Sequence, residues 1–172
     1  MPLISLTEEH ILERLKQENP WWATGSVDED YTKMQKRLYF DLFYPLVEDI
    51  SIRRAVILMG PRRVGKTVMI YHTIDTLLKS GISPHQIAFV SVENPFFNKI
   101  ALEQLFKICL KATGKPEPKG WYVFFDEIQY LKDWEVHLKA LVDSYPHVKF
   151  VVSGSAAAAL KLKSNESGAG RF

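Results

Sequence analysis

Residues 60–67 read Gly-Pro-Arg-Arg-Val-Gly-Lys-Thr and fit the pattern G-x-x-x-x-G-K-[ST] at every constrained position. An apolar run from Ala55 to Met59 precedes the segment, and a stretch typical of a helix follows from Val68. A strand, a glycine-rich loop and a helix in this order form a phosphate-binding loop, because main-chain N–H groups and the helix N-terminus face the phosphate oxygens. The segment therefore predicts an α/β fold that binds a phosphorylated ligand.

The residue types inside this loop suggest separate roles. Lys66 can reach the β- and γ-phosphates of a nucleotide, and the hydroxyl of Thr67 can ligate Mg²⁺. Arg62 and Arg63 are ambiguous, since one can lie near phosphate while the other is solvated. The residues expected to surround the phosphates are Gly60, Pro61, Arg62, Arg63, Val64, Gly65, Lys66, Thr67 and Val68.

Two acids follow a second apolar run. Residues 121–125 read Trp-Tyr-Val-Phe-Phe, and Asp126 and Glu127 come next. A buried parallel strand delivers such side chains to its C-terminal end, where ligands bind in open α/β sheets. We expect Asp126 to hold Mg²⁺ and Glu127 to orient and deprotonate an attacking water. Acids that simply end a strand are common, so the prediction depends on the phosphate loop upstream.

Further candidates lie after these acids. Ser153 or Ser155 can present a hydroxyl between the γ-phosphate and Glu127, although a polar turn after a strand explains them equally well. Gln129 is a weaker candidate for a hydrogen bond to the water or to Ser153. Arg171 is either a finger that stabilises charge on the transferring phosphoryl group or a tail arginine. If it acts on a neighbouring copy, the protein is a homo-oligomer.

The rest of the chain alternates helix and strand patterns. Helices are expected over residues 5–19, 28–43, 67–80, 98–113 and 133–144, and strands over residues 54–59, 87–92, 121–125 and 148–152. Ser5 and Glu8 have capping-box spacing for the first helix, and Asp133 is placed to cap the last. Apolar strands that alternate with helices indicate a parallel sheet covered on both faces. We expect residues 1–53 to be a helical extension packed on a core formed by residues 54–172.

Composition excludes several classes of protein. The net charge is +2 and no run of Lys or Arg stands out, so nucleic acid is not an expected partner. No segment approaches the ~18 uncharged apolar residues of a membrane span, and the N-terminus does not read as a signal peptide. The single cysteine, Cys109, cannot form an internal disulfide and fits a reducing compartment. We therefore expect a cytoplasmic protein.

The order of four segments, GPRRVGKT, WYVFFDEIQYLKDW, FVVSGSAAAAL and ESGAGR, together with the early NPWW, resembles the prokaryotic AAA-type P-loop ATPases of the signal-transduction branch. The resemblance implies a three-layer α/β/α core of the additional-strand, catalytic-glutamate type, with sheet order 5-1-4-3-2, and it implies ATP and Mg²⁺ as ligands. It matches Lys66 and Thr67 to the first nucleotide motif and Asp126 and Glu127 to the second. It also matches Ser153 to the sensor position and Arg171 to the closing arginine.

Two features depart from that family. Four alanines at residues 156–159 replace a turn that is commonly rich in serine. Family members continue beyond the position of Phe172 into a fifth strand and a C-terminal domain of unknown function, so we expect a truncated core. A truncated core would leave the first strand as an unprotected sheet edge.

The leading hypothesis is an ATPase core whose hydrolysis of ATP with Mg²⁺ switches the conformation of a C-terminal region. A small-molecule kinase is one alternative, although the sequence has no Arg-rich lid. A non-catalytic nucleotide-binding or nucleic-acid-associated module is another. The G-specific pattern N-K-x-D is missing from the sequence, which favours ATP over GTP.

Overall fold

The computed structural model describes residues 7–155, and a four-stranded parallel sheet lies at their centre. The strands are β1 (Val56–Gly60), β2 (Ile87–Ser91), β3 (Trp121–Asp126) and β4 (Val148–Ser155). Their order is β1-β4-β3-β2, and every neighbouring pair is parallel. This arrangement confirms the expected sheet for the strands within the described residues.

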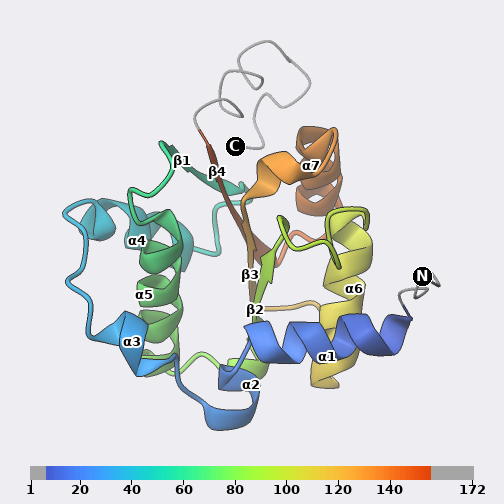
Figure 1. The fold of residues 1–172 in the computed structure, drawn as a ribbon, viewed down its shortest axis with the longest axis horizontal. Helices are drawn as coiled ribbons and strands as arrows, with labels where there is room; N and C mark the ends of the chain where they lie inside the picture. The colour runs from blue at the N-terminus through green and yellow to red at the C-terminus, as the bar shows by residue number, and fades with distance from the viewer. Residues whose placement is uncertain (1–6, 156–172) are drawn as a thin grey trace, which may run out of the picture.

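Helices cover both faces of the sheet, which gives the expected three layers (Figure 1). One face carries α5 (Lys66–Lys79), against which α3 (Glu29–Thr32) and α4 (Phe40–Glu48) pack. The other carries α6 (Leu102–Thr113), which contacts both α1 (Glu8–Glu18) and α7 (Trp134–Ser144). The short elements are α2 (Trp21–Thr24), η1 (Pro84–Gln86) and η2 (Ile128–Tyr130).

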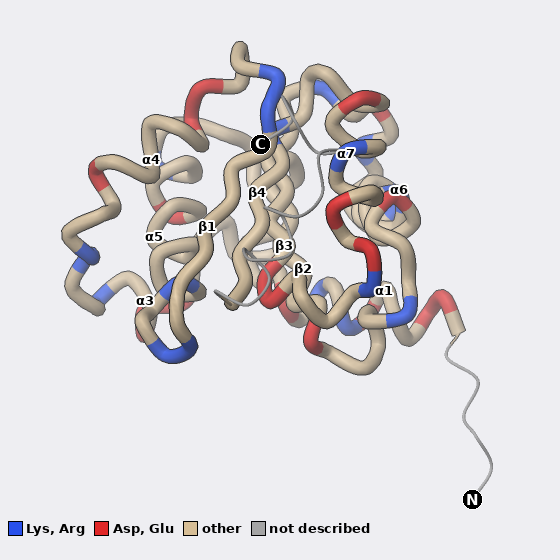
Figure 2. The backbone as a smooth tube through the Cα atoms, turned by 90° about the horizontal axis from the view of Figure 1, so that it is seen from above, with Lys and Arg blue, Asp and Glu red and all other residues tan. Residues whose placement is uncertain are grey.

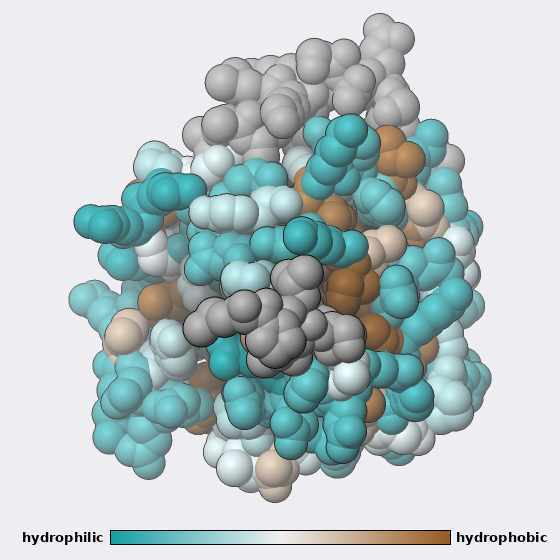
Figure 3. Space-filling model, turned by 45° about the vertical axis from the view of Figure 1, so that its right-hand side comes forward, coloured by the Kyte–Doolittle hydropathy of each residue, from teal (hydrophilic) through white to brown (hydrophobic). Residues whose placement is uncertain are grey.

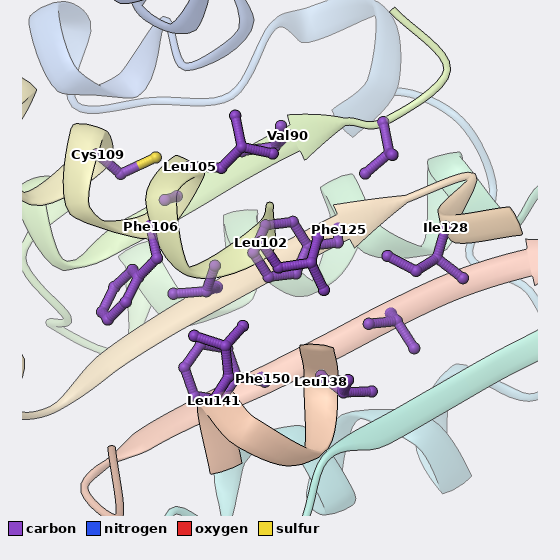
Figure 4. Close-up of a cluster of buried hydrophobic side chains, with 14 of the residues drawn as sticks. Val90, Leu102, Leu105, Phe106, Cys109, Phe125, Ile128, Leu138, Leu141 and Phe150 are labelled. Atoms are coloured by element: carbon purple, nitrogen blue, oxygen red, sulfur yellow. The ribbon is translucent and has the colours of Figure 1, made fainter. Parts of the chain in front are cut away.

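Each face of the sheet has its own apolar core. Between the sheet and α6 and α7, aromatic rings of Phe106, Phe125 and Phe150 pack with leucines of both helices (Figure 4). Ile70, Ile74 and Leu77 of α5 fill the opposite side. Cys109 is fully buried in the first core, and burial raises the pKa of its thiol to about 12. It is therefore a small buried apolar residue rather than a reactive thiol.

The N-terminal helices differ from the expectation. Helix α1 begins at Glu8, and its N-cap is Thr7, whose hydroxyl accepts from the N–H of His10 at 3.4 Å. The expected cap Ser5 lies outside the described residues. The helix predicted over residues 28–43 is wrong as one element, because α3 ends at Thr32 and α4 begins only at Phe40.

The error has a physical cause in the apolar spacing. Met34, Leu38 and Leu42 follow one another at intervals of four residues, which is typical of one face of a helix, yet all three side chains are exposed. The core-facing residues of α4 are instead Phe40, Phe43 and Val47, and Pro45 lies inside the helix rather than ending it.

One other helix start and one expected helix cap were also wrong. Helix α6 begins at Leu102 rather than at residue 98, because residues 94–100 form successive turns that include the bond from the N–H of Phe97 to the Asn94 carbonyl. Helix α7 begins where expected, but the Asp133 side chain makes no capping hydrogen bond. Asp133 instead adopts a left-handed backbone conformation, with φ of 54°.

Side chains of residues 18–22 cover the outer edge of β2. Asn19 bonds both main-chain groups of Phe89, accepting from its N–H at 2.6 Å and donating to its carbonyl at 2.8 Å. The indole N–H groups of Trp21 and Trp22 both donate to the Ile87 carbonyl, at 3.0 and 2.8 Å. The two tryptophans therefore hold the segment around α2 against the edge of β2.

The surface mixes charges of both signs. Figure 2 shows Lys and Arg interspersed with Asp and Glu over the helices, and the face in Figure 3 is largely hydrophilic with scattered apolar side chains. Within residues 7–155, no helix is both long enough and apolar enough to cross a bilayer.

Candidate functional site

The glycine-rich loop joins β1 to α5 as the sequence predicted. Gly65 has φ of 89° and Arg63 has φ of 64°, so the chain turns through two left-handed residues immediately before the helix. Successive N–H groups in such a turn form a concave anion-binding surface. The Lys66 ammonium donates to the carbonyls of Gly60 and Pro61, at 3.1 and 2.7 Å, which holds it within the curve of the loop.

The two sequence motifs meet at one hydrogen bond. The Thr67 hydroxyl donates to Asp126 Oδ2 at 2.7 Å, although 59 residues separate them in the chain. Asp126 is the last residue of β3, and Thr67 is in the first turn of α5. The parallel sheet therefore brings the loop and the carboxylate into direct contact, as the two motifs predicted.

Ser153 of β4 completes this contact from the neighbouring strand. Its hydroxyl donates to Asp126 Oδ1 and accepts from the N–H of Glu127 at 3.3 Å. The side chain is fully buried. Ser153 therefore fixes both acids relative to β4, whereas the hydrogen bond that links Ser155 to Gln129 comes from its main-chain N–H.

Burial raises the pKa of Asp126, and the negative charge of Glu127 adds to that effect. The hydrogen bonds from Ser153 and Thr67 oppose it. A desolvated carboxylate of this kind is stabilised when a cation approaches it. Two oxygen donors, the Thr67 hydroxyl and the Asp126 carboxylate, are the ligand type that Mg²⁺ prefers. Within residues 7–155 there is no group of three or more His, Cys, Asp or Glu side chains that would hold a metal by itself.

Glu127 turns out of the sheet in a left-handed conformation, with φ of 54°. Its carboxylate accepts a hydrogen bond from the Gln129 amide, and Gln129 Oε1 in turn accepts from the N–H of Ser155 at 3.3 Å. Gln129 thus contacts Glu127 and β4 rather than the Ser153 hydroxyl. From the sequence alone Gln129 is only a weak candidate, because its placement depends on the turn that follows β3.

Two arginines near the loop have different neighbours, and one of them, Arg37, carries no signal in the sequence. Arg62 donates to the Tyr130 hydroxyl at 3.2 Å. Arg37, from the turn before α4, lies over Gly65 so closely that a Cβ on that glycine would be 2.7 Å from two guanidinium nitrogens. No local pattern marks Arg37, since the contact joins residues 28 positions apart.

An apolar cavity of about 700 Å³ opens beside the loop. Its walls come from the segment before and within α4, from the end of β1 and from the first turns of α5. Leu38, Leu42 and Leu46 line it and are all more than half exposed. Leu38 and Leu42, whose spacing misled the helix prediction, thus form part of a wall of this cavity.

A second, polar cavity of about 440 Å³ lies on the other side of Asp126. Thr67, Asp126 and Glu127 line it together with Arg14 and Glu18 from α1. Glu18 accepts from the N–H of Ser91 at 3.0 Å, and burial raises its pKa. The N-terminal extension therefore forms a wall next to the two acids.

Arg171 and the alanines at 156–159 lie outside the described residues. The finger assigned to Arg171 and the fifth strand consequently stay predictions.

Comparisons with known proteins gave a family match, curated relatives and a solved structure. The model of a family described as "AAA domain" matches residues 52–172. Two curated relatives are uncharacterized proteins: MJ1637 of Methanocaldococcus jannaschii is 28% identical over 140 residues, and one from Haemophilus influenzae is 26% identical over 99 residues. The matches cover 77% and 58% of this chain but only 28% and 24% of the relatives, so the chain spans about a quarter of their length. A solved structure described as C. elegans PCH-2 is 12% identical, with a TM-score of 0.40, covering 90% of this chain and 42% of that one.

Proposed function

Since the chain belongs to the AAA domain family and forms a nucleotide-binding ATPase core of that type, we propose that it binds ATP with Mg²⁺ at residues 60–67 and hydrolyses it. The contact between Thr67 and Asp126 is the observation that carries this proposal, because it joins the phosphate loop to the acids at the C-terminal edge of the sheet.

Each residue then has a distinct role. The main-chain N–H groups of the loop and the Lys66 ammonium bind the β- and γ-phosphates. Glu127 accepts the proton of the attacking water, and its place in the cavity that Thr67 and Asp126 also line supports this assignment. Ser153 positions both acids, and Arg171 is the proposed arginine that stabilises phosphoryl charge. Thr67 and Asp126 would hold Mg²⁺, which neutralises phosphate charge when bound.

The apolar cavity beside the loop is the proposed site of the adenine ring. Its lining includes Gly60 and Gly65 of the phosphate loop as well as the apolar side chains of Leu42 and Met69. This combination suits a flat apolar base attached to a phosphate tail.

Leu42→Ser tests the base site. Leu42 is 71% exposed, so the change should leave folding intact while it removes apolar contact with the base. We expect ATP affinity to fall about 3- to 10-fold, equivalent to roughly 1 kcal/mol, and the affinity for inorganic triphosphate to stay the same. Calorimetric titration with both ligands measures the difference. Equal losses for the two ligands would place the base elsewhere.

Lys66→Ala tests the phosphate site. Loss of a charge-assisted hydrogen bond of about 1.5–3 kcal/mol predicts a fall in Mg-ATP affinity of roughly 10- to 100-fold. Titration of ATP and GTP, with and without Mg²⁺, measures affinity and base preference together. Lys79→Ala is the matched control, because Lys79 lies on the same helix and its side chain is 72% exposed. Unchanged affinity in Lys66→Ala contradicts the site.

Several parts of the proposal concern the whole protein. Hydrolysis would switch a C-terminal domain, and a homo-oligomer would follow if Arg171 acts on a neighbouring copy. Residues 1–53 would be a helical extension on a core of residues 54–172, and the protein would be cytoplasmic. Release of phosphate without an added acceptor would distinguish hydrolysis from transfer to a small-molecule alcohol.

A further inference from the structure

Glu127 is tied to β4 at two points. Its main-chain N–H donates to Ser153 Oγ at 3.3 Å, and its carboxylate accepts from the Gln129 amide. Gln129 Oε1 then accepts from the N–H of Ser155, two residues further along β4. The main chain of Glu127 is therefore bonded directly to β4, and its carboxylate is linked to the same strand through Gln129.

The end of β4 is shaped to receive the Gln129 side chain. A Cβ on Gly154 would lie 3.0 Å from Gln129 Oε1 and 3.2 Å from Ile128 Cγ2 and from Met59 Sδ. These distances are tighter than ordinary van der Waals contact, so only glycine leaves the space that Gln129 occupies. Gly154 and Ser155 pair in turn with Met59 and Gly60 of β1, the strand that enters the phosphate loop.

The chemistry of the contact requires an amide. Gln129 donates to a carboxylate with one end and accepts from a main-chain N–H with the other. Glutamate at this position has no donor for Glu127 and adds a like charge beside it, while methionine has similar length but neither group. The left-handed backbone of Glu127 (φ 54°) is uncommon for a residue with a side chain, which is consistent with an orientation set by its surroundings.

We propose that Gln129 is a positioning residue for the reaction: it holds the Glu127 carboxylate in place and fixes it relative to the end of β4. The proposal rests on the assignment of Glu127 as the general base. Its consequence is that displacement of the Gly154–Ser155 segment changes the position of the Glu127 carboxylate.

Kinetics of the full chain test the proposal. We expect Gln129→Met to lower the maximal rate of ATP hydrolysis about 10- to 100-fold, the scale of a misplaced catalytic group, with Mg-ATP affinity within about threefold of the original protein. Gln129→Glu should lower the rate further, and Gly154→Ala should lower it by displacing the amide. Lys132→Met is the matched control, because this residue is exposed three positions further on and should leave the rate unchanged.

A double variant separates positioning from a general structural effect. In a Glu127→Gln background, adding Gln129→Met should cause no further loss beyond about twofold, since the group that Gln129 positions is already gone. A rate within twofold in Gln129→Met alone, or an equal loss in both backgrounds, overturns the proposal.

Nuclear magnetic resonance provides a readout that needs no turnover. The side-chain amide signals of Gln129, identified by their loss in Gln129→Met, should shift when Glu127→Ala removes the acceptor. Unshifted signals overturn the contact. If the protein binds no nucleotide or releases no phosphate, the proposed function fails, and this measurement still decides whether Gln129 holds Glu127.

Discussion

Glu127→Gln is expected to lower the rate of ATP hydrolysis at least about 100-fold while Mg-ATP binding stays within a few-fold of the original protein. Glutamine keeps the size of the side chain and one carbonyl oxygen, so the Gln129 amide still has an acceptor. It cannot take a proton from water, because an amide is not a base near neutral pH. The change therefore removes the proposed chemistry and preserves the shape of the site.

Single-turnover measurements with a fixed excess of protein over ATP separate the chemical step from binding. Glu93→Gln is the matched control, since Glu93 lines the same polar cavity but is exposed and contacts neither Asp126 nor the phosphate loop through a hydrogen bond in the described residues. Equal losses in the two variants would indicate a general effect of cavity charge. An unaltered rate in Glu127→Gln would remove the base assignment.

Asn19→Ala is expected to destabilise the protein by about 3 kcal/mol. The side chain is fully buried and bonds the N–H and carbonyl of Phe89 and the carbonyl of Leu15, the last at 2.7 Å. Its removal leaves buried main-chain groups without partners, and each such group costs roughly 1–3 kcal/mol. For a chain of this size, the loss corresponds to a fall in melting temperature of about 6–12 °C.

Chemical denaturation and thermal melting both measure this change. Glu13→Ala on α1, the helix whose C-cap is Asn19, is the control, because Glu13 is exposed and should alter stability by less than about 0.5 kcal/mol. A loss below 1 kcal/mol in Asn19→Ala would mean that the edge of β2 finds other partners when the amide is absent.

Local patterns predicted much of the fold and the centre of the site. The four strands, the loop at residues 60–67 and its contact with Asp126 follow from apolar runs and motifs of neighbouring residues, whereas the order of the strands was implied by the family resemblance. The AAA-type family inferred from those motifs is confirmed by the match to residues 52–172.

The features that the sequence did not reveal depend on contacts between distant segments. Arg37 reaches Gly65 because α4 packs beside α5. Leu38 and Leu42 line a cavity, although their spacing in the sequence is typical of one face of a helix. Gln129 bonds Glu127 because Glu127 adopts a left-handed conformation that no local pattern required. Spacing along the chain cannot distinguish such cases, since the same residues also fit an ordinary turn or helix.

The side chains that cover the outer edge of β2 prevent a further strand from pairing at that edge of the sheet. The carbonyl of Ile87, both main-chain groups of Phe89 and the N–H of Ser91 are already hydrogen-bonded, so an incoming strand would have to displace four side chains, those of Glu18, Asn19, Trp21 and Trp22, to pair there. Within residues 7–155, β1 has no neighbour beyond it and all five of its residues are only half-buried. An incoming strand therefore has room alongside β1 alone, where it would lie against the strand that leads directly into the phosphate loop.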